Sequence, residues 1–221
     1  MGVTHVWYTG IIRHASATDY SQHGIPRQHP DVVKGKAGSP YAIADYYDVD
    51  PDLAVDVDRR MAEFEALVER THLAGMKVIV DFVPNHVARQ YRSICKPEGV
   101  RDLGEDDNPD MGFSPQNNFY YCTGQEFIAP VSSESDSSLL TPRYIEHPAK
   151  ATGNDCFTNA PSRNDWYETV KLNYGVDYMA GQSPINYPST PITPKWRGVR
   201  SFLLKGKAVW LNVFACVAEK Q

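Results

Sequence analysis

The polar side chains with the widest chemical range follow one apolar run: Asp81, Asn85 and His86, in the stretch KVIVDFVPNH. A carboxylate, an amide and an imidazole offer hydrogen bonds to a ligand, ligand atoms to a metal ion, and groups that transfer protons. The same side chains could also have local structural roles, with Asp81 accepting backbone N–H groups, Asn85 turning the chain and His86 lying in a loop. The elements around them help to decide between these interpretations.

The run before these polar residues predicts a strand. Residues 78–80 are β-branched, as is typical of a strand buried in a parallel sheet. Pro84 cannot donate to a sheet ladder, so the strand should end near Phe82 or Val83. In parallel α/β folds, side chains at the carboxyl ends of strands face the crevice in which ligands bind. We therefore expect the polar residues to lie at such a crevice.

The preceding sequence predicts the rest of a βαβ unit. A strand is expected within residues 3–9 and a helix from Asp56, its N-cap, to Ala74, with Gly75 ending it. One face of this helix carries an apolar stripe: Val57, Met61, Phe64, Leu67 and Val68. Strand, helix and strand in this order pack as a parallel pair with a crossover helix. Residues 10–51 are predicted to be a long loop at the same sheet edge as Asp81.

The second half of the chain has less regular patterns. Residues 88–161 predict an irregular, β-containing excursion. Within and beyond it we expect strands in 119–131, an exposed loop at 132–138, ordered chain at 165–178, a short helix at 195–205 and a strand at 207–217.

Composition excludes several classes of partner. A net charge of -5, with no run of Lys or Arg, argues against nucleic acid and against a membrane surface. No apolar stretch reaches the length of a transmembrane helix, and no signal peptide is recognised, which makes the cytoplasm the default compartment. The cysteines lack C-x-x-C spacing, so no zinc knuckle or redox motif is predicted.

Several stretches, in chain order, resemble one known family. DFVPNH at residues 81–86 is similar to the first signature region of the α-amylase superfamily, glycoside hydrolase family 13. GVTHVWYTG resembles the family's second strand, GSPYAIADYYDVDP the loop after it, and HLAGMKVIVD the run into the third strand. KLNYG at 171–175 resembles the signature that closes the inserted domain.

The resemblance implies an α/β fold: a partial (β/α)8 TIM barrel with about strands two to four and an irregular, β-containing domain inserted after the third strand. Residues 1–86 would form the partial barrel, 87–170 the inserted domain, and 171–221 the return to the barrel through a degraded fourth-strand region. The missing remainder of the barrel would be a partner of the chain.

The resemblance also implies a sugar-binding site. Tyr41 would stack on the sugar at the scissile bond, and His86 would hydrogen-bond a hydroxyl group of the same sugar. Asp45, counted among the substrate-binding residues, would support the Tyr41 loop through ion pairing. Asp81 would be a structural carboxylate that orients its surroundings. The implied substrate is an α-glucan or an oligosaccharide.

A structural calcium is implied as well, although no cofactor is needed for the chemistry. Asn85 would supply an amide oxygen and Asn173 a second ligand. Lys171 stands where the family often has an acidic or neutral residue, and an ammonium group weakens a calcium site.

The end of the chain departs from the family pattern. Ala215 stands in the place of the arginine of the family's GFRxDxA motif, and no nucleophilic aspartate follows Cys216. Glu219 lies past that place, and the acid/base glutamate of the fifth strand is not in this sequence. Because a retaining glycosidase needs two carboxyl groups about 5 Å apart, no catalytic residue is predicted here.

The leading prediction is therefore a fragment of an α-amylase-type glycosidase acting on α-glucosidic bonds of oligo- or polysaccharides, inactive as given. The alternative is a non-catalytic carbohydrate-binding protein derived from the same fold. A barrel enzyme of other chemistry, such as a metal-dependent hydrolase using Asp81 and His86, requires that the ordered matches be coincidental.

Overall fold

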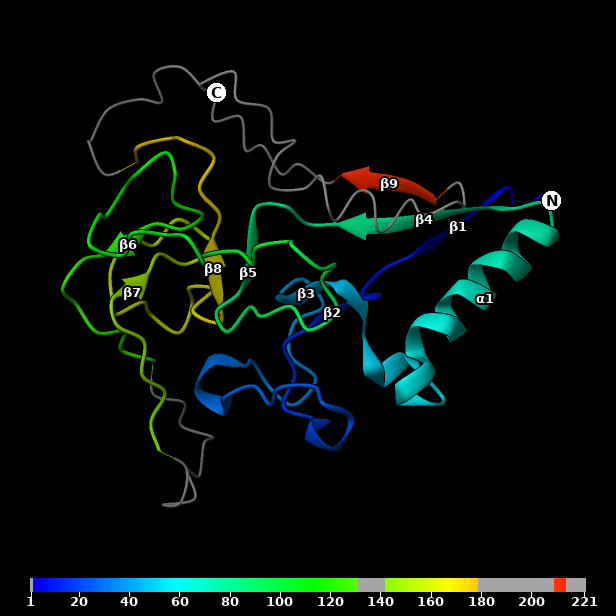
Figure 1. The fold of residues 1–221 in the computed structure, drawn as a ribbon, viewed down its shortest axis with the longest axis horizontal. Coiled ribbons are helices and arrows are strands. Elements are labelled where there is room, and N and C mark those ends of the chain that lie inside the picture. Colours follow the sequence, from blue (N-terminus) through cyan, green and yellow to red (C-terminus); the bar gives the residue numbers. More distant parts are fainter. Residues whose placement is uncertain (1, 131–141, 179–208, 214–221) are drawn as a thin grey trace.

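A computed structural model describes residues 2–130 and 142–178 and the backbone of residues 209–213. Figure 1 shows an elongated molecule, with a parallel sheet and a long helix at one end and short antiparallel strands at the other. The predicted loop at 132–138 and the predicted helix at 195–205 lie outside the described residues. Within those residues, no helix combines the length and the apolar character needed to cross a membrane.

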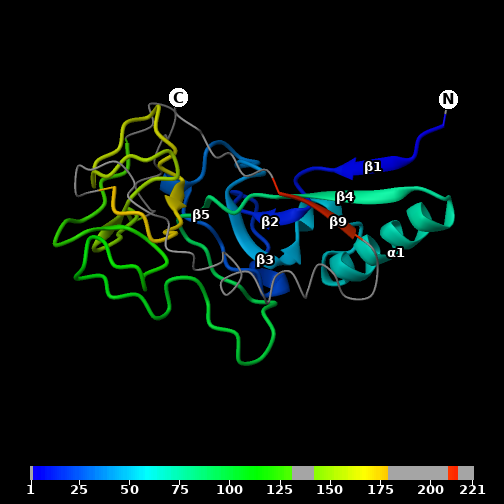
Figure 2. The same cartoon turned by 90° about the horizontal axis from the view of Figure 1, so that it is seen from above.

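Three parallel strands form the sheet beside the helix (Figure 2). They are β1 (His5–Tyr8), β4 (Lys77–Phe82) and β9 (Val209–Val213), in the order β1-β4-β9. The strands predicted within residues 3–9 and before the Pro84 turn are confirmed, and β9 lies inside the predicted third one. The carboxyl ends of all three strands point to the same edge of the sheet.

The helix α1 (Arg60–Leu73) follows one turn of 3-10 helix, η4 (Val57–Arg59). Asp56 caps this turn, because its carboxylate accepts the backbone N–H two residues later at 3.1 Å. Gly75 follows α1 with a φ of +76°, a conformation that glycine adopts without strain. The predicted helix is confirmed, with a first turn tighter than an α-helix. Its inner face joins β4 in one apolar cluster that includes Phe64, Val68, Val78 and Val80.

The prediction of an unbroken loop at residues 10–51 is wrong, because this region contains two strands. β2 (Ile12–His14) pairs antiparallel with β3 (Ile43–Val49), with an irregular register. Every residue of β3 is buried, including its two aspartates, since arginine side chains pair with them. Local sequence patterns do not reveal such distant partners. Short 3-10 turns complete the region: η1 (Ser21–His23), η2 (Pro30–Val32) and η3 (Pro51–Leu53).

Short strand pairs hold the region after β4. β5 (His86–Ala88) pairs antiparallel with β8 (Thr169–Lys171), so the chain leaves and returns at adjacent positions. β6 (Tyr121–Cys122) pairs with β7 (Ala149–Lys150), and β6 falls in the stretch where strands were expected. The remainder of the described excursion is mainly turns and loops. One buried cluster joins it to β3 and β4, and it includes Tyr46, Phe82, Val87, Tyr121 and Val170.

Candidate functional site

Two tyrosines hold the turn between β4 and β5. Tyr46 donates its hydroxyl group to the carbonyl oxygen of Val83 at 2.5 Å and lies 3.3 Å from the carbonyl oxygen of His86. Tyr174 donates to the carbonyl oxygen of Pro84. Burial raises the pKa of Tyr46 well above its usual value, which keeps the phenol protonated as a donor. These contacts fix the backbone that carries His86.

The His86 ring is buried and electrically neutral. The residue is 4% exposed, and among the described residues its buried Nδ1 has no hydrogen-bond partner. Burial lowers the pKa of His86 to about 4; the backbone of Tyr41 partly offsets this effect and the Lys171 ammonium group adds to it. At pH 7 the ring therefore has one nitrogen that donates and one that accepts. A hydroxyl group, which also does both, is a suitable ligand for it.

The pKa of His86 predicts a loss of stability in mild acid. The unfolded chain binds a proton near pH 6.5 and the native chain only near pH 4, so native stability falls as the pH drops through this window. Between pH 8 and pH 5 the His86 contribution to the loss should be about 2 kcal/mol. Urea unfolding of the wild-type chain and of His86→Gln at both pH values measures it. An equal loss in the two proteins would contradict the assignment.

Tyr41 presents its ring to solvent from an anchored backbone. The residue is 45% exposed, and its backbone N–H donates to the Ser39 hydroxyl oxygen at 3.3 Å. The next residue, Ala42, accepts the backbone N–H of Ala15 at 2.8 Å. The Tyr41 backbone also lies close enough to the His86 ring to affect its pKa. The structure thus places the backbone of an exposed tyrosine next to a buried neutral imidazole.

Asp45 has no exposed surface, and donors surround its carboxylate. It pairs with the Arg13 guanidinium at 3.2 Å and accepts the Ser93 hydroxyl group at 2.6 Å. Three backbone N–H groups also donate to it, from Tyr47, Ile94 and Cys95. These contacts leave no oxygen of Asp45 facing a ligand. Asp45 is thus ion-paired to Arg13 and holds residues 93–95, while its support of the Tyr41 loop and its place among the substrate-binding residues stay predictions.

A second carboxylate and a thiol lie beside Asp45. Asp45 and Asp48 each offer a carboxylate oxygen and Cys95 offers its Sγ atom. These three atoms lie within 4.8 Å of one another. Asp48, however, already pairs with Arg13 at 3.0 Å and with Arg60 at 2.6 Å. Burial raises the pKa of Cys95 to about 11, so its thiolate scarcely forms at pH 7. This group of residues is an ion-pair network and does not fit a metal ion.

The three polar residues predicted at the end of the strand do not lie together. Asp81 is within β4, whereas Asn85 and His86 follow it. Asp81 lies inside β4, where it is buried and accepts the indole N–H of Trp7 on β1 at 2.6 Å. Asn85 is half-buried in the turn, and its carbonyl oxygen accepts the backbone N–H of Leu172 at 3.1 Å. His86 begins the next strand. The contact of Asp81 is with the neighbouring strand, and its orienting role stays a prediction.

The surroundings of Asn173 do not fit the implied calcium, and the amide of Asn85 stays a predicted ligand. The buried Asn173 side chain donates to a backbone carbonyl at 2.7 Å and accepts the Gly175 N–H at 2.8 Å. Two residues earlier, the Lys171 ammonium group pairs with the Asp155 carboxylate. Calcium favours several free oxygen ligands, usually with carboxylates among them. The Lys171 ammonium group is positively charged, and the Asn173 amide already makes hydrogen bonds within the chain. Neither group supplies a free oxygen ligand.

Trp166 is the residue of this site that the sequence analysis missed. Its ring centroid lies 5.2 Å from that of His86, with 58° between the ring planes, and the residue is 43% exposed. Arg13, Tyr46 and Tyr174 were missed as well. Each acts on a residue at least 32 positions away, and no local spacing predicts such a contact.

Comparison with known proteins gives one consistent result. Residues 1–177 match the family described as Alpha amylase, catalytic domain. An alpha-glucosidase of Culex pipiens is 28% identical over 83 residues, which are 36% of this chain and 13% of that protein. Maltase 1 of Drosophila virilis is 34% identical over 67 residues, which are 30% of this chain and 10% of that protein.

Two solved structures are similar in sequence over less than half of the chain. An alpha-amylase from Lactobacillus plantarum is 31% identical, with a TM-score of 0.31, over 42% of this chain and 17% of its own. A maltogenic alpha-amylase from Thermotoga neapolitana is 31% identical, with a TM-score of 0.29, over 41% of this chain and 17% of that protein. The matched part of this chain spans less than a fifth of the length of each relative.

Proposed function

The chain belongs to the alpha-amylase family of glycoside hydrolases, and on that premise we propose that its site binds the α-linked glucose units of oligo- or polysaccharides. The match to the catalytic domain implies a TIM-barrel fragment, and we propose that the parallel strands β1, β4 and β9 belong to it. We place them as its second, third and fourth strands, with 87–170 as the inserted domain and 171–221 as the return.

One observation carries this proposal: the backbone of the exposed residue Tyr41 lies against the ring of the buried, neutral His86. A stiff aromatic ring suits the C–H-rich face of a pyranose, because little side-chain freedom is lost on binding. The neutral imidazole suits a sugar hydroxyl group, which donates and accepts. The two tyrosine contacts to the turn before β5 hold the imidazole in place before a sugar arrives.

We further propose that this chain by itself binds such sugars without cleaving them. The positions that resemble the family's nucleophile motif hold Ala215 and Cys216 and no aspartate. Without a pair of carboxyl groups, neither the glycosyl-enzyme intermediate nor protonation of the leaving group is available. Binding without turnover is also what a non-catalytic carbohydrate-binding protein of the same fold would show, and the missing carboxyl pair favours that second candidate.

Calorimetry with maltohexaose on the 221-residue chain tests the proposal. We expect binding, with no reducing sugar released on incubation. Tyr41→Ala should weaken binding about fivefold, because stacking on the phenol ring contributes about 1 kcal/mol. Tyr41→Phe keeps the ring and should bind as the wild type does.

Each contrary result has a separate meaning. A wild-type chain that does not bind maltohexaose contradicts sugar binding. Hydrolysis by the wild-type chain contradicts the predicted inactivity and leaves binding intact. Equal affinity of Tyr41→Ala and the wild type removes Tyr41 from the site.

A further inference from the structure

We propose that Trp166 is a second aromatic contact for the sugar, presented by the inserted region beside His86; this inference rests on the proposed function. The indole ring packs on the imidazole with centroids 5.2 Å apart, yet 43% of the residue remains exposed. An indole exposed to this extent on a fixed backbone leaves apolar surface in water that a ligand could cover.

The backbone of Trp166 is held on both sides. Its N–H donates to the side-chain oxygen of Asn154 at 3.1 Å. Its carbonyl oxygen accepts both the backbone N–H and the hydroxyl group of Thr169, each at 2.8 Å. Trp166 therefore occupies a set position before any ligand binds, and little entropy is lost in ordering it.

The turn before Trp166 is braced by Asp165. Its carboxylate accepts the backbone N–H and the hydroxyl group of Ser162, each at 2.8 Å, and the side-chain amide of Asn154 at 3.0 Å. The Asn154 and Ser162 side chains lower the pKa of Asp165, so the carboxylate stays ionised as an acceptor at neutral pH. The position of the indole thus depends on a connected hydrogen-bond network.

Gly153 lets this segment approach His86. A Cβ atom at Gly153 would lie 2.5 Å from the Thr169 hydroxyl oxygen and 2.9 Å from the Cβ atom of His86. Any larger residue would push the segment away from the imidazole. The contact between the rings therefore requires glycine at this position.

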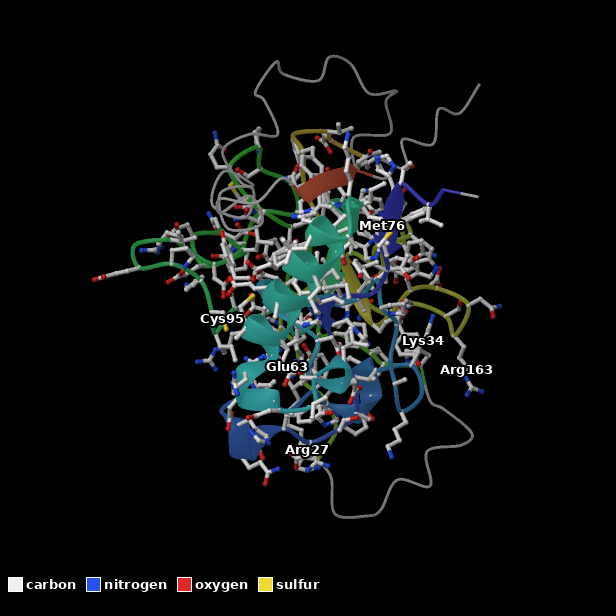
Figure 3. The ribbon with its side chains drawn as sticks, turned by 90° about the vertical axis from the view of Figure 1, so that its right-hand side faces the viewer. Arg27, Lys34, Glu63, Met76, Cys95 and Arg163 are labelled. Atoms are coloured by element: carbon white, nitrogen blue, oxygen red, sulfur yellow. The ribbon has the colours of Figure 1, made fainter. Side chains whose placement is uncertain are left out.

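Lys34 connects the Trp166 segment to the region that carries Tyr41. Its ammonium group donates to the backbone carbonyl of Asp165 at 2.9 Å and lies 3.2 Å from the Glu168 carboxylate. Figure 3 shows Lys34 and the nearby Arg163 on the same side of the molecule. Two regions that are more than 120 positions apart in sequence thus meet at one imidazole: the Trp166 ring packs on it, and the backbone of Tyr41 lies close to it.

This arrangement selects a class of ligand. An exposed indole beside a neutral imidazole suits a pyranose, whose faces are apolar and whose edge carries hydroxyl groups. The inserted region would then add contact area, and hence affinity, to the site at the end of β4. Trp166 takes no part in proton transfer and serves only as a binding surface.

Calorimetry and fluorescence with maltohexaose on the 221-residue chain test this role. Trp166→Ala should bind about tenfold more weakly than the wild type, whereas Trp166→Phe, which keeps an aromatic face, should stay within about threefold. Ile145→Ala is the control, since Ile145 is 70% exposed in the same region, and should bind normally. Maltohexaose should also change the tryptophan emission of the wild type, and this change should be absent in Trp166→Phe and present in Ile145→Ala.

The outcomes separate this inference from the proposed function. If the wild type and Trp166→Ala bind with equal affinity, the inference is overturned and sugar binding stands. If the wild type does not bind, both fail. If Trp166→Ala does not fold, the emission of Trp166→Phe decides. A change in emission on adding maltohexaose to this variant overturns the inference. An emission that does not change supports it.

Discussion

Replacing Asp45 by alanine should lower the free energy of unfolding by about 3–5 kcal/mol. The carboxylate is fully buried and pairs with Arg13, which is 2% exposed. Removing it leaves the buried guanidinium group with Asp48 and the carbonyl oxygen of Arg92, and leaves four further donors without their acceptor. An unpaired buried donor loses its water without gaining a partner, and this accounts for the large effect.

Urea unfolding at pH 7 measures this change, and Asp19→Ala is the matched control. Asp19 also pairs with an arginine, Arg27 at 3.6 Å, but both side chains are about half exposed or more. Its replacement should change stability by less than about 0.5 kcal/mol. A loss below about 1 kcal/mol in Asp45→Ala would mean that water reaches the Arg13 site, and the loop-supporting role of Asp45 would then be incorrect.

The sequence analysis succeeded where short-range periodicity dominates. The stripe of α1 repeats every three or four residues, and β4 begins with adjacent β-branched residues, so each element is visible within a window of about ten residues. The strand β3 was not predicted, because its buried positions include two aspartates. Charge in a strand ordinarily indicates exposure, and only the folded chain shows that Arg13 and Arg60 neutralise it.

The candidate site divides in the same way. Tyr41 and His86 were predicted because they lie in stretches with recognisable motifs. The Tyr41 backbone does lie close to the His86 ring, and the roles of both at a sugar stay predictions. Trp166 lies 80 positions from His86 in irregular sequence, and no spacing rule connects the two. The tyrosines that hold the His86 turn come from β3 and from the start of the segment that follows the inserted domain. Contacts made by tertiary structure alone are those that sequence patterns cannot supply.

Gly38→Ala should be the other strongly destabilising change, at about 3 kcal/mol or more. Gly38 has a φ of +69°, and a Cβ atom there would lie 1.8 Å from the carbonyl oxygen of Ala15. That oxygen belongs to the backbone and cannot swing aside as a side chain would. The alanine must therefore either move the loop or break the packing of residues 35–42 against Ala15.

Gly35→Ala separates the two causes, because Gly35 has nearly the same φ, +68°, and no atom within 4 Å of the added Cβ. It should lose only the cost of a left-handed alanine, about 1 kcal/mol, in the same urea experiment. Equal losses in the two variants would mean that the loop yields freely at Gly38. A larger loss at Gly38 would show that this contact is rigid. Since Ala15 also donates its N–H to Ala42, next to Tyr41, the same rigidity would hold the Tyr41 backbone beside His86.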